Sequence, residues 1–141
     1  MPSSINQIPK RTFDGCQQLF ASDDLSHFNK DFLKNIVTIG EYAFNGAAMK
    51  NTVIYEKTTS IGDKAFALYG NLIGKHIKLI GGKSESNGLN YDSCGSDIFS
   101  GRNLTLQVDM ASKYYNDDRW KDKFNVTGTG SSFEAIDNLQ P

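Results

Sequence analysis

A six-residue phrase occurs twice in this chain at a spacing of 22 residues. Residues 39–44 read Ile-Gly-Glu-Tyr-Ala-Phe, and residues 61–66 read Ile-Gly-Asp-Lys-Ala-Phe. A phrase kept at one spacing marks a repeat architecture, because each unit carries a small apolar set that it cannot bury alone. We therefore predict a stack of similar units. Phe44, Phe66 and Phe99 are expected to form one buried ladder, and Ile39 and Ile61 a second ladder beside it.

Two weaker copies flank these phrases. In the first copy, Pro9 stands at the glycine position and Thr12 at the alanine position, before Phe13. The last copy, residues 97–101, keeps the Ile98-Phe99 step and a following glycine. The glycine after each isoleucine is expected to permit a tight bend or a positive φ angle. Repeats are predicted near residues 5–19, 36–55, 58–80 and 97–108, within a repeat domain over residues 1–126.

Other stretches interrupt or end the array. Residues 20–35 place apolar side chains at helical spacing, which predicts an inserted short helix against the stack. Residues 81–96 begin with a glycine- and serine-rich run, which predicts an insertion loop. Residues 109–126 are expected to form a helical cap in which Trp120 closes the end of the stack, since an open end would expose strand edges. Residues 127–141 resemble a linker in composition.

Strands are predicted at residues 52–55 and 75–80, which are rich in β-branched and aromatic residues. Strands of successive units should pair in parallel at roughly 4.8 Å and build a narrow sheet. If Ile54 and Ile77 point inward, alternation sends Tyr55, His76 and Lys78 to the solvent side, with Lys57 just beyond. These four residues are the candidate partner-binding residues. The alternative is an ordinary hydrated sheet face without a partner.

These repeats resemble the BspA-like leucine-rich repeats of bacterial surface proteins and some parasitic protists. The end of the array, with Leu104–Val108, Tyr114, Trp120 and Phe124, is similar to the terminal strand and cap of that family, although Asp109 stands where a proline is usual. The resemblance implies an α/β repeat solenoid: a leucine-rich-repeat-like stack with a narrow parallel sheet, an inserted helix and a C-terminal helical cap. Cys16, three residues after Phe13, falls where the family often has a buried cysteine. A ladder residue is therefore favoured over a disulfide to Cys94.

The resemblance also implies a function. It predicts a non-catalytic protein-interaction module of a cell-surface or secreted adhesin-like protein, whose partner is a protein or glycoprotein of a host or matrix. Residues 1–6 lack the features of a signal peptide, so a cytoplasmic protein is the alternative to a chain whose signal lies outside this sequence. The resemblance favours the second. A spacer segment without its own partner is a further alternative.

The motifs of common enzymes and metal sites are absent from the sequence. There is no His-Glu-x-x-His, Cys-x-x-Cys or Gly-x-Ser-x-Gly, and the two histidines, His27 and His76, are separated by an intact repeat. We expect no catalysis, no cofactor and no metal site. The enzymatic alternative is a β-solenoid carbohydrate-active enzyme, which would place several Asp or Glu residues on the exposed strand face. Residues 52–55 and 75–80 contain none.

Charge and hydropathy exclude two further classes of partner. The formal net charge is -1, so no electrostatic footprint favours nucleic acid. No stretch approaches 18 consecutive apolar residues, which excludes insertion of a helix into a membrane. We expect a monomer.

Overall fold

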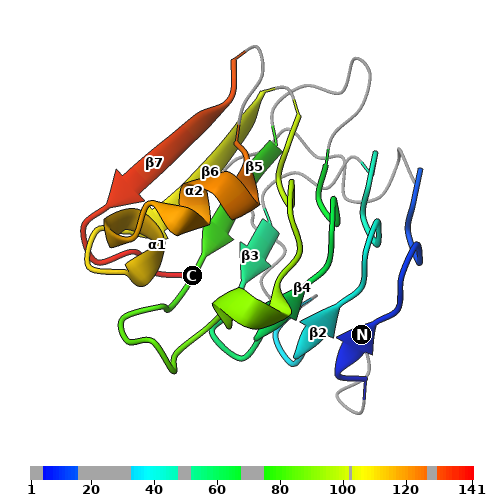
Figure 1. Cartoon of the computed structure of the whole chain (residues 1–141), viewed down its shortest axis with the longest axis horizontal. Helices are drawn as coiled ribbons and strands as arrows, with labels where there is room; N and C mark the ends of the chain where they lie inside the picture. Colours follow the sequence, from blue (N-terminus) through cyan, green and yellow to red (C-terminus); the bar gives the residue numbers. More distant parts are fainter. Residues whose placement is uncertain (1–4, 16–32, 48–51, 68–74, 102, 127–129) are drawn as a thin grey trace.

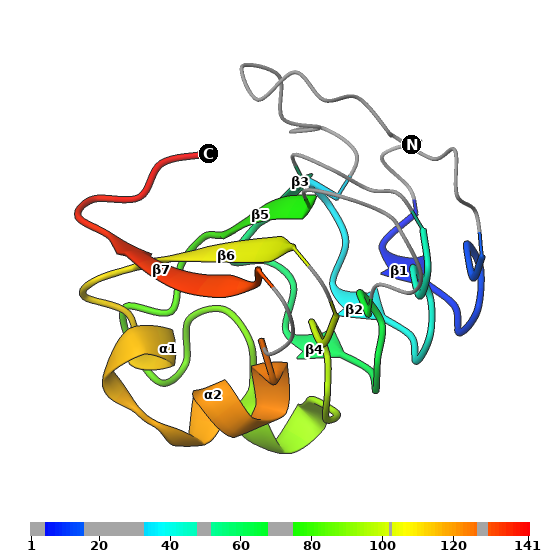
Figure 2. The same ribbon diagram turned by 90° about the horizontal axis from the view of Figure 1, so that it is seen from above.

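The computed structural model describes residues 5–15, 33–47, 52–67, 75–101, 103–126 and 130–141. They form a parallel-stranded β-solenoid of about four turns with little helix (Figures 1 and 2). Two sheets run along it, and neighbouring strands are parallel in both. The first sheet has the order β1-β2-β4 and consists of Gln7–Ile8, Thr38–Ile39 and Ser60–Ile61. The second has the order β3-β5-β6-β7 and consists of Thr52–Ile54, Lys75–Leu79, Leu104–Asp109 and Ser132–Ile136.

The repeated phrase itself forms the first sheet. Each glycine after the isoleucine donates its N–H to the isoleucine carbonyl of the preceding turn, at 2.7 Å from Gly40 to Ile8 and 2.8 Å from Gly62 to Ile39. The three isoleucines of β1, β2 and β4 are buried side by side. Sequence reasoning expected one sheet, from the strands at 52–55 and 75–80. The turn with β2 and β3 and the turn with β4 and β5 each contribute to two sheets, because the residues before the glycine are also extended and paired.

The fourth copy of the phrase begins at Cys94 rather than at the Asp97 expected from the sequence. Gly95 donates its N–H to the Ile61 carbonyl at 2.9 Å, which is the bond that Gly62 makes in the turn before. Cys94 therefore occupies the isoleucine position and is 7% exposed. The sequence concealed this copy because cysteine replaces isoleucine and isoleucine replaces alanine. The insertion that precedes it is correspondingly shorter than residues 81–96.

The glycines of the phrase serve close approach between turns rather than a positive φ angle. A β-carbon added to Gly40 would overlap the backbone of Lys10, and one added to Gly62 would overlap the backbone of Glu41. Positive φ angles occur instead two residues before each phenylalanine, at Arg11, Tyr42, Lys64 and Asp97. Only a residue without a side chain fits where one turn passes this close to the next.

The phenylalanines of successive turns stack on one another. Ring centroids lie 5.2 Å apart for Phe13 and Phe44, 5.0 Å for Phe44 and Phe66, and 5.4 Å for Phe66 and Phe99. A backbone bond accompanies each step, since Phe44 donates to the Ala65 carbonyl at 2.7 Å. The ladder is thus held by ring packing and by a parallel backbone register.

The second sheet confirms the parallel pairing predicted for the strands. Thr52 lies opposite Ile77, and Ile54 opposite Leu79. The inward row continues through β6, where Leu106 and Val108 are fully buried. One face of this sheet therefore builds the core, and alternation leaves the other face to form the outer surface of the solenoid.

The segment after residue 108 contains two short helices and a further strand. Helices α1 (Lys113–Asn116) and α2 (Arg119–Phe124) lie beside the last turn, and the Phe99 N–H bonds the Phe124 carbonyl at 2.9 Å. Trp120 is fully buried. β7 then pairs with β6, within a stretch that its composition had marked as linker-like. Threonine, glycine and serine make up residues 127–132, but Phe133 and Ala135 supply the alternation of a strand.

Two insertions were predicted between the repeats. Of the one at 20–35, residues 20–32, including His27, lie outside the described residues, as does Cys16; residues 33–35 form a turn. Between β5 and Cys94 the chain makes turns and a short 3₁₀ helix, η1 (Tyr91–Ser93). Within the described ranges, no helix has the length and apolar character needed to cross a membrane.

Candidate functional site

The outer face of the four-stranded sheet carries polar side chains in register. Lys78 on β5 lies opposite Gln107 on β6, which lies opposite Glu134 on β7. One step along the strands, His76 lies opposite Thr105. These side chains are outward because their neighbours on each strand point into the core. Three adjacent strands thus present a cation, an amide, a carboxylate, an imidazole and a hydroxyl on one surface.

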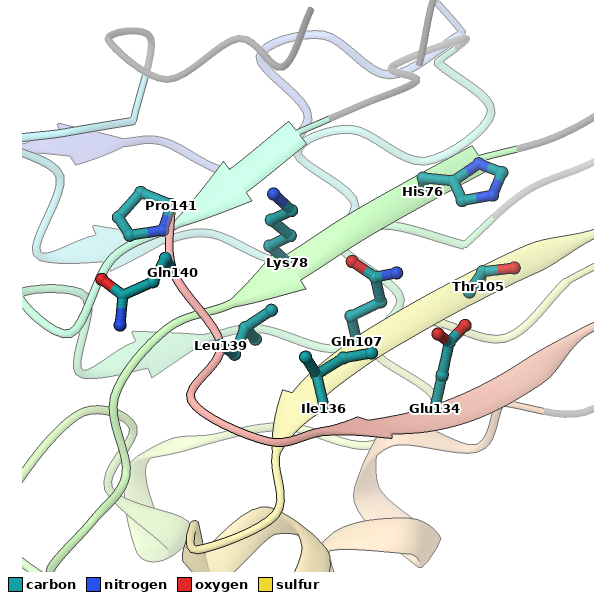
Figure 3. A pocket seen from close by; sticks show the side chains of 9 residues that line it. All are labelled: His76, Lys78, Thr105, Gln107, Glu134, Ile136, Leu139, Gln140 and Pro141. Carbon is teal, nitrogen blue, oxygen red and sulfur yellow. The ribbon is translucent and has the colours of Figure 1, made fainter. Parts of the chain in front are cut away.

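These side chains line a groove of about 580 Å³. Figure 3 shows them rising from β5, β6 and β7 along one side of the sheet. The residues of the described chain that line the groove come from the three strands and from the C-terminal segment: His76, Lys78, Thr105, Gln107, Glu134, Ile136, Leu139, Gln140 and Pro141. We call it the sheet groove.

The His76 imidazole carries a buried nitrogen whose hydrogen bonding is incomplete. Its Nδ1 atom is shielded from solvent and has no hydrogen-bond partner within the described part of the chain. A shielded nitrogen without a partner costs free energy, about 1–3 kcal/mol.

A second groove of about 390 Å³ lies at the carboxyl ends of the strands. Its lining includes Tyr55, Glu56, Lys83 and Asp109. Leu139, Gln140 and Pro141 line this groove as well as the sheet groove. We call it the end groove. The C-terminal segment is therefore the wall shared by the two grooves.

Asp109 anchors this part of the surface. Its side chain is buried, and its carboxylate accepts hydrogen bonds from the N–H of Ala111 at 2.8 Å and from the N–H of Leu139 at 3.1 Å. The Lys83 ammonium lies 3.6 Å from the same carboxylate. The aspartate thus organises the turn after β6 and holds the C-terminal segment.

The structure separates the four candidate residues predicted from the sequence. His76 and Lys78 line the sheet groove, and Tyr55 lines the end groove. Lys57 is exposed in the turn after β3 and lines neither groove. Lys78 stands beside Val53 of β3, which is fully buried although it belongs to the outward row.

Sequence reasoning missed Thr105, Gln107, Glu134 and the C-terminal segment. The alternation of Leu104–Asp109 contained a signal for Thr105 and Gln107, because these two residues separate three apolar ones. Glu134 was missed because residues 127–141 were interpreted as a linker. No local signal places residues 139–141 across a sheet whose strands come from four different units.

Three further buried titratable groups, Cys94, Tyr114 and Lys113, lie near α1 and α2 and line neither groove. Burial raises the pKa of the Cys94 thiol, and burial raises the pKa of the Tyr114 hydroxyl. Burial lowers the pKa of the Lys113 ammonium, which stands 5.6 Å from the Trp120 ring centroid. A thiol with a raised pKa stays protonated and is a poor nucleophile, so Cys94 acts here as a small ladder residue.

No group of three or more His, Cys, Asp or Glu side chains within the described residues is arranged to hold a metal ion. The only carboxylate among the described residues that line the sheet groove is that of Glu134. The surface is thus equipped for hydrogen bonding and ion pairing with a ligand.

The comparisons with known proteins agree with the repeat architecture. A family described as BspA type Leucine rich repeat region (6 copies) matches residues 1–110. No curated protein and no solved structure matches the chain. BspA-type repeats are typical of surface proteins and are commonly associated with protein-binding modules, and leucine-rich repeats are typically non-catalytic. The match spans most of the chain and coincides with the stacked turns, so this protein belongs to the BspA-type leucine-rich repeat family.

Proposed function

We propose that this chain is a non-catalytic binding module that holds a protein or glycoprotein partner on the outer face of its four-stranded sheet. The observation that carries the proposal is the convergence of Lys78, Gln107 and Glu134 from three adjacent strands on one groove. Family membership supports a protein partner and a location at the cell surface or outside the cell. Matrix or host glycoproteins are the proposed partners, and the module is proposed to act as a monomer.

The sheet makes the groove a suitable contact surface. The backbone that carries these side chains is already ordered by strand pairing, so less conformational entropy is lost on binding than for side chains on a flexible loop. The groove also combines donors, acceptors and both signs of charge, which favours a polar partner with complementary groups over a purely apolar one. The proposed contacts are made chiefly by His76, Lys78, Gln107 and Glu134, with Tyr55 reached at the end groove.

The enzymatic alternative receives less support from the same groove. Hydrolysis of a glycosidic bond generally uses two carboxyl groups about 5 to 9.5 Å apart. Glu134 lines the sheet groove, whereas the nearest outward carboxylate on the neighbouring strand, Asp109, already accepts two backbone hydrogen bonds. A single uncommitted carboxylate suits recognition of a partner better than this chemistry.

We also infer that α1 and α2 close the core at the C-terminal end of the stack. Phe124 lies edge-on against Phe99 with centroids 5.3 Å apart, and Trp120 packs against Tyr114 at 4.9 Å. These rings extend the phenylalanine ladder beyond its last turn. Burial of the last cross-section would keep the module monomeric.

The test of the proposed function is binding to immobilised host-matrix glycoproteins, measured by surface plasmon resonance. The double variant Gln107→Arg, Glu134→Arg fills the sheet groove and reverses its acidic charge. The matched control, Gln7→Arg, Glu41→Arg, makes the same chemical changes at two exposed residues outside the grooves. We expect the groove variant to lose at least about tenfold in affinity, which corresponds to about 1.4 kcal/mol, and the control to bind like the native chain. Equal binding by both variants would remove the sheet groove from the proposal, and a native chain that binds none of the glycoproteins would leave the spacer alternative.

A further inference from the structure

The C-terminal segment lies across the proposed binding surface. After β7 the chain turns at Asp137 and Asn138, where Asn138 adopts a left-handed φ of 55°. Figure 3 shows the segment then running back over the sheet toward the end of β3. Leu139, Gln140 and Pro141 thereby form the wall between the sheet groove and the end groove. The segment thus stands between the part of the surface that holds His76 and the part that holds Tyr55.

Among the residues that the structure describes, one buried side chain and one hydrogen bond attach the segment to the sheet. Leu139 is 7% exposed, whereas Gln140 and Pro141 are exposed. Within the described residues, the hydrogen bond that joins residues 139–141 to the sheet runs from the Leu139 N–H to the Asp109 carboxylate at 3.1 Å. The other bond of this segment, from Gln140 to the Asn138 carbonyl at 3.5 Å, stays within the segment.

The attachment point has the chemistry of a peptide site. Asp109 is 3% exposed, and its Oδ1 accepts the Ala111 N–H. Its Oδ2 lies 3.6 Å from the Lys83 ammonium and accepts the Leu139 N–H, so this oxygen can take an N–H donor above the sheet beside the ion pair. Next to this oxygen lies the position that the leucine side chain fills. A buried carboxylate strongly favours a donor, because an unsatisfied charged acceptor is costly. An N–H group beside an apolar side chain is what an extended peptide presents.

The geometry points to the following: residues 139–141 act as an intramolecular strap that occupies a subsite for an extended peptide, and this subsite accepts a leucine-like side chain whose backbone N–H bonds Asp109. The inference rests on the proposed function, since it names the kind of partner segment that the same surface takes. A partner peptide displaces the strap, replaces its hydrogen bond and gains access to both grooves. The strap therefore lowers the affinity of the resting module for its partner.

The direct test uses the strap sequence itself as the probe and needs no external partner. A fluorescent peptide with the sequence of residues 135–141, Ala-Ile-Asp-Asn-Leu-Gln-Pro, is titrated against the full chain and against its Leu139→Ser variant, with binding followed by fluorescence anisotropy. Serine keeps the backbone but removes the apolar anchor. We expect the variant to bind the peptide at least about tenfold more tightly than the native chain, because burial of one leucine is worth that much or more. The variant Gln140→Ser, which alters the exposed neighbour, is expected to bind like the native chain.

Two further measurements test whether the peptide's leucine and the Asp109 carboxylate make the proposed contacts. In the first, a peptide with serine in place of its leucine should no longer bind the Leu139→Ser protein. In the second, a protein with both Asp109→Asn and Leu139→Ser should bind the original peptide more weakly than the protein with Leu139→Ser alone. Thermal unfolding of each variant establishes that it is folded. Equal peptide binding by the native chain and a folded Leu139→Ser variant would overturn the strap, as would equal binding of the two peptides. The glycoprotein-binding assay is independent of this result. If the strap is wrong, the chain can still bind glycoproteins; if the chain binds no glycoprotein, the peptide measurement still tests the strap.

Discussion

The Phe44 and Phe66 rings, 22 residues apart in the sequence, stack with their centroids 5.0 Å apart and their planes inclined by 21°. Both rings are fully buried, and each touches the ring of the next turn on its other side. Removing one ring from the middle of such a ladder therefore affects three turns, whereas removing a terminal ring affects two.

Phe66→Ala is expected to lower the free energy of unfolding by about 3–5 kcal/mol, as for an aromatic side chain removed from a packed core. Phe13→Ala should cost less, since Phe13 is only partly buried and stacks on one described neighbour. Chemical denaturation of the two variants and the native chain makes the comparison. An unchanged midpoint for Phe66→Ala would contradict the ladder as the source of stability.

Gly62→Ala is expected to cost about 3 kcal/mol or more, at the upper end of what overpacking costs, because the new methyl group would overlap the backbone of Glu41. The control is Gly15→Ala, which has a φ of 77° but no atom within 4 Å of the added carbon. That change should cost only about 1–2 kcal/mol, for the left-handed conformation alone. Equal losses in thermal or chemical unfolding would show that close approach of the turns does not select the glycine.

Alkaline pH is expected to destabilise the fold. Burial raises the pKa of Cys94 above its ordinary value of 9.0 and that of Tyr114 above 10.0. The folded state then holds these protons more tightly than the unfolded state, so the stabilising contribution is complete below about pH 9 and declines as the pH rises beyond it. The decline is at most about 1.4 kcal/mol per pH unit for each group.

The pH prediction is tested with Cys94→Val, which keeps an apolar ladder residue but removes the thiol. Its unfolding free energy should fall less steeply than that of the native chain between pH 9 and 10. Lys113, whose pKa is lowered chiefly by burial and raised in part by the Cys94 charge, contributes with the opposite sign in this range. Loss of the thiol lowers the pKa of Lys113 further, which also makes the fall less steep in the variant. Parallel curves for the two proteins would mean that Cys94 does not titrate on unfolding.

The repeat period, the parallel pairing of the strands and the stacked architecture follow from the sequence alone. The physical reason is that these features are local and recur. A turn that passes close over the one before it needs glycine at one position and a ring four residues later, and this pattern returns at Gly40, Gly62 and Gly95. The fourth copy was only partly recognisable from the sequence, because Cys94 and Ile98 differ from the repeated residues although the turn keeps the same geometry.

Only the tertiary structure decided what the surface of the protein offers. The sheet groove combines side chains from β5, β6 and β7, and its wall, Leu139, depends on a carboxylate 30 residues earlier in the chain. Such contacts join segments whose separation follows no period, so no spacing in the sequence announces them. The ladder inside is specified by the repeat itself, whereas the binding surface outside depends on register between strands and on where the chain returns after β7.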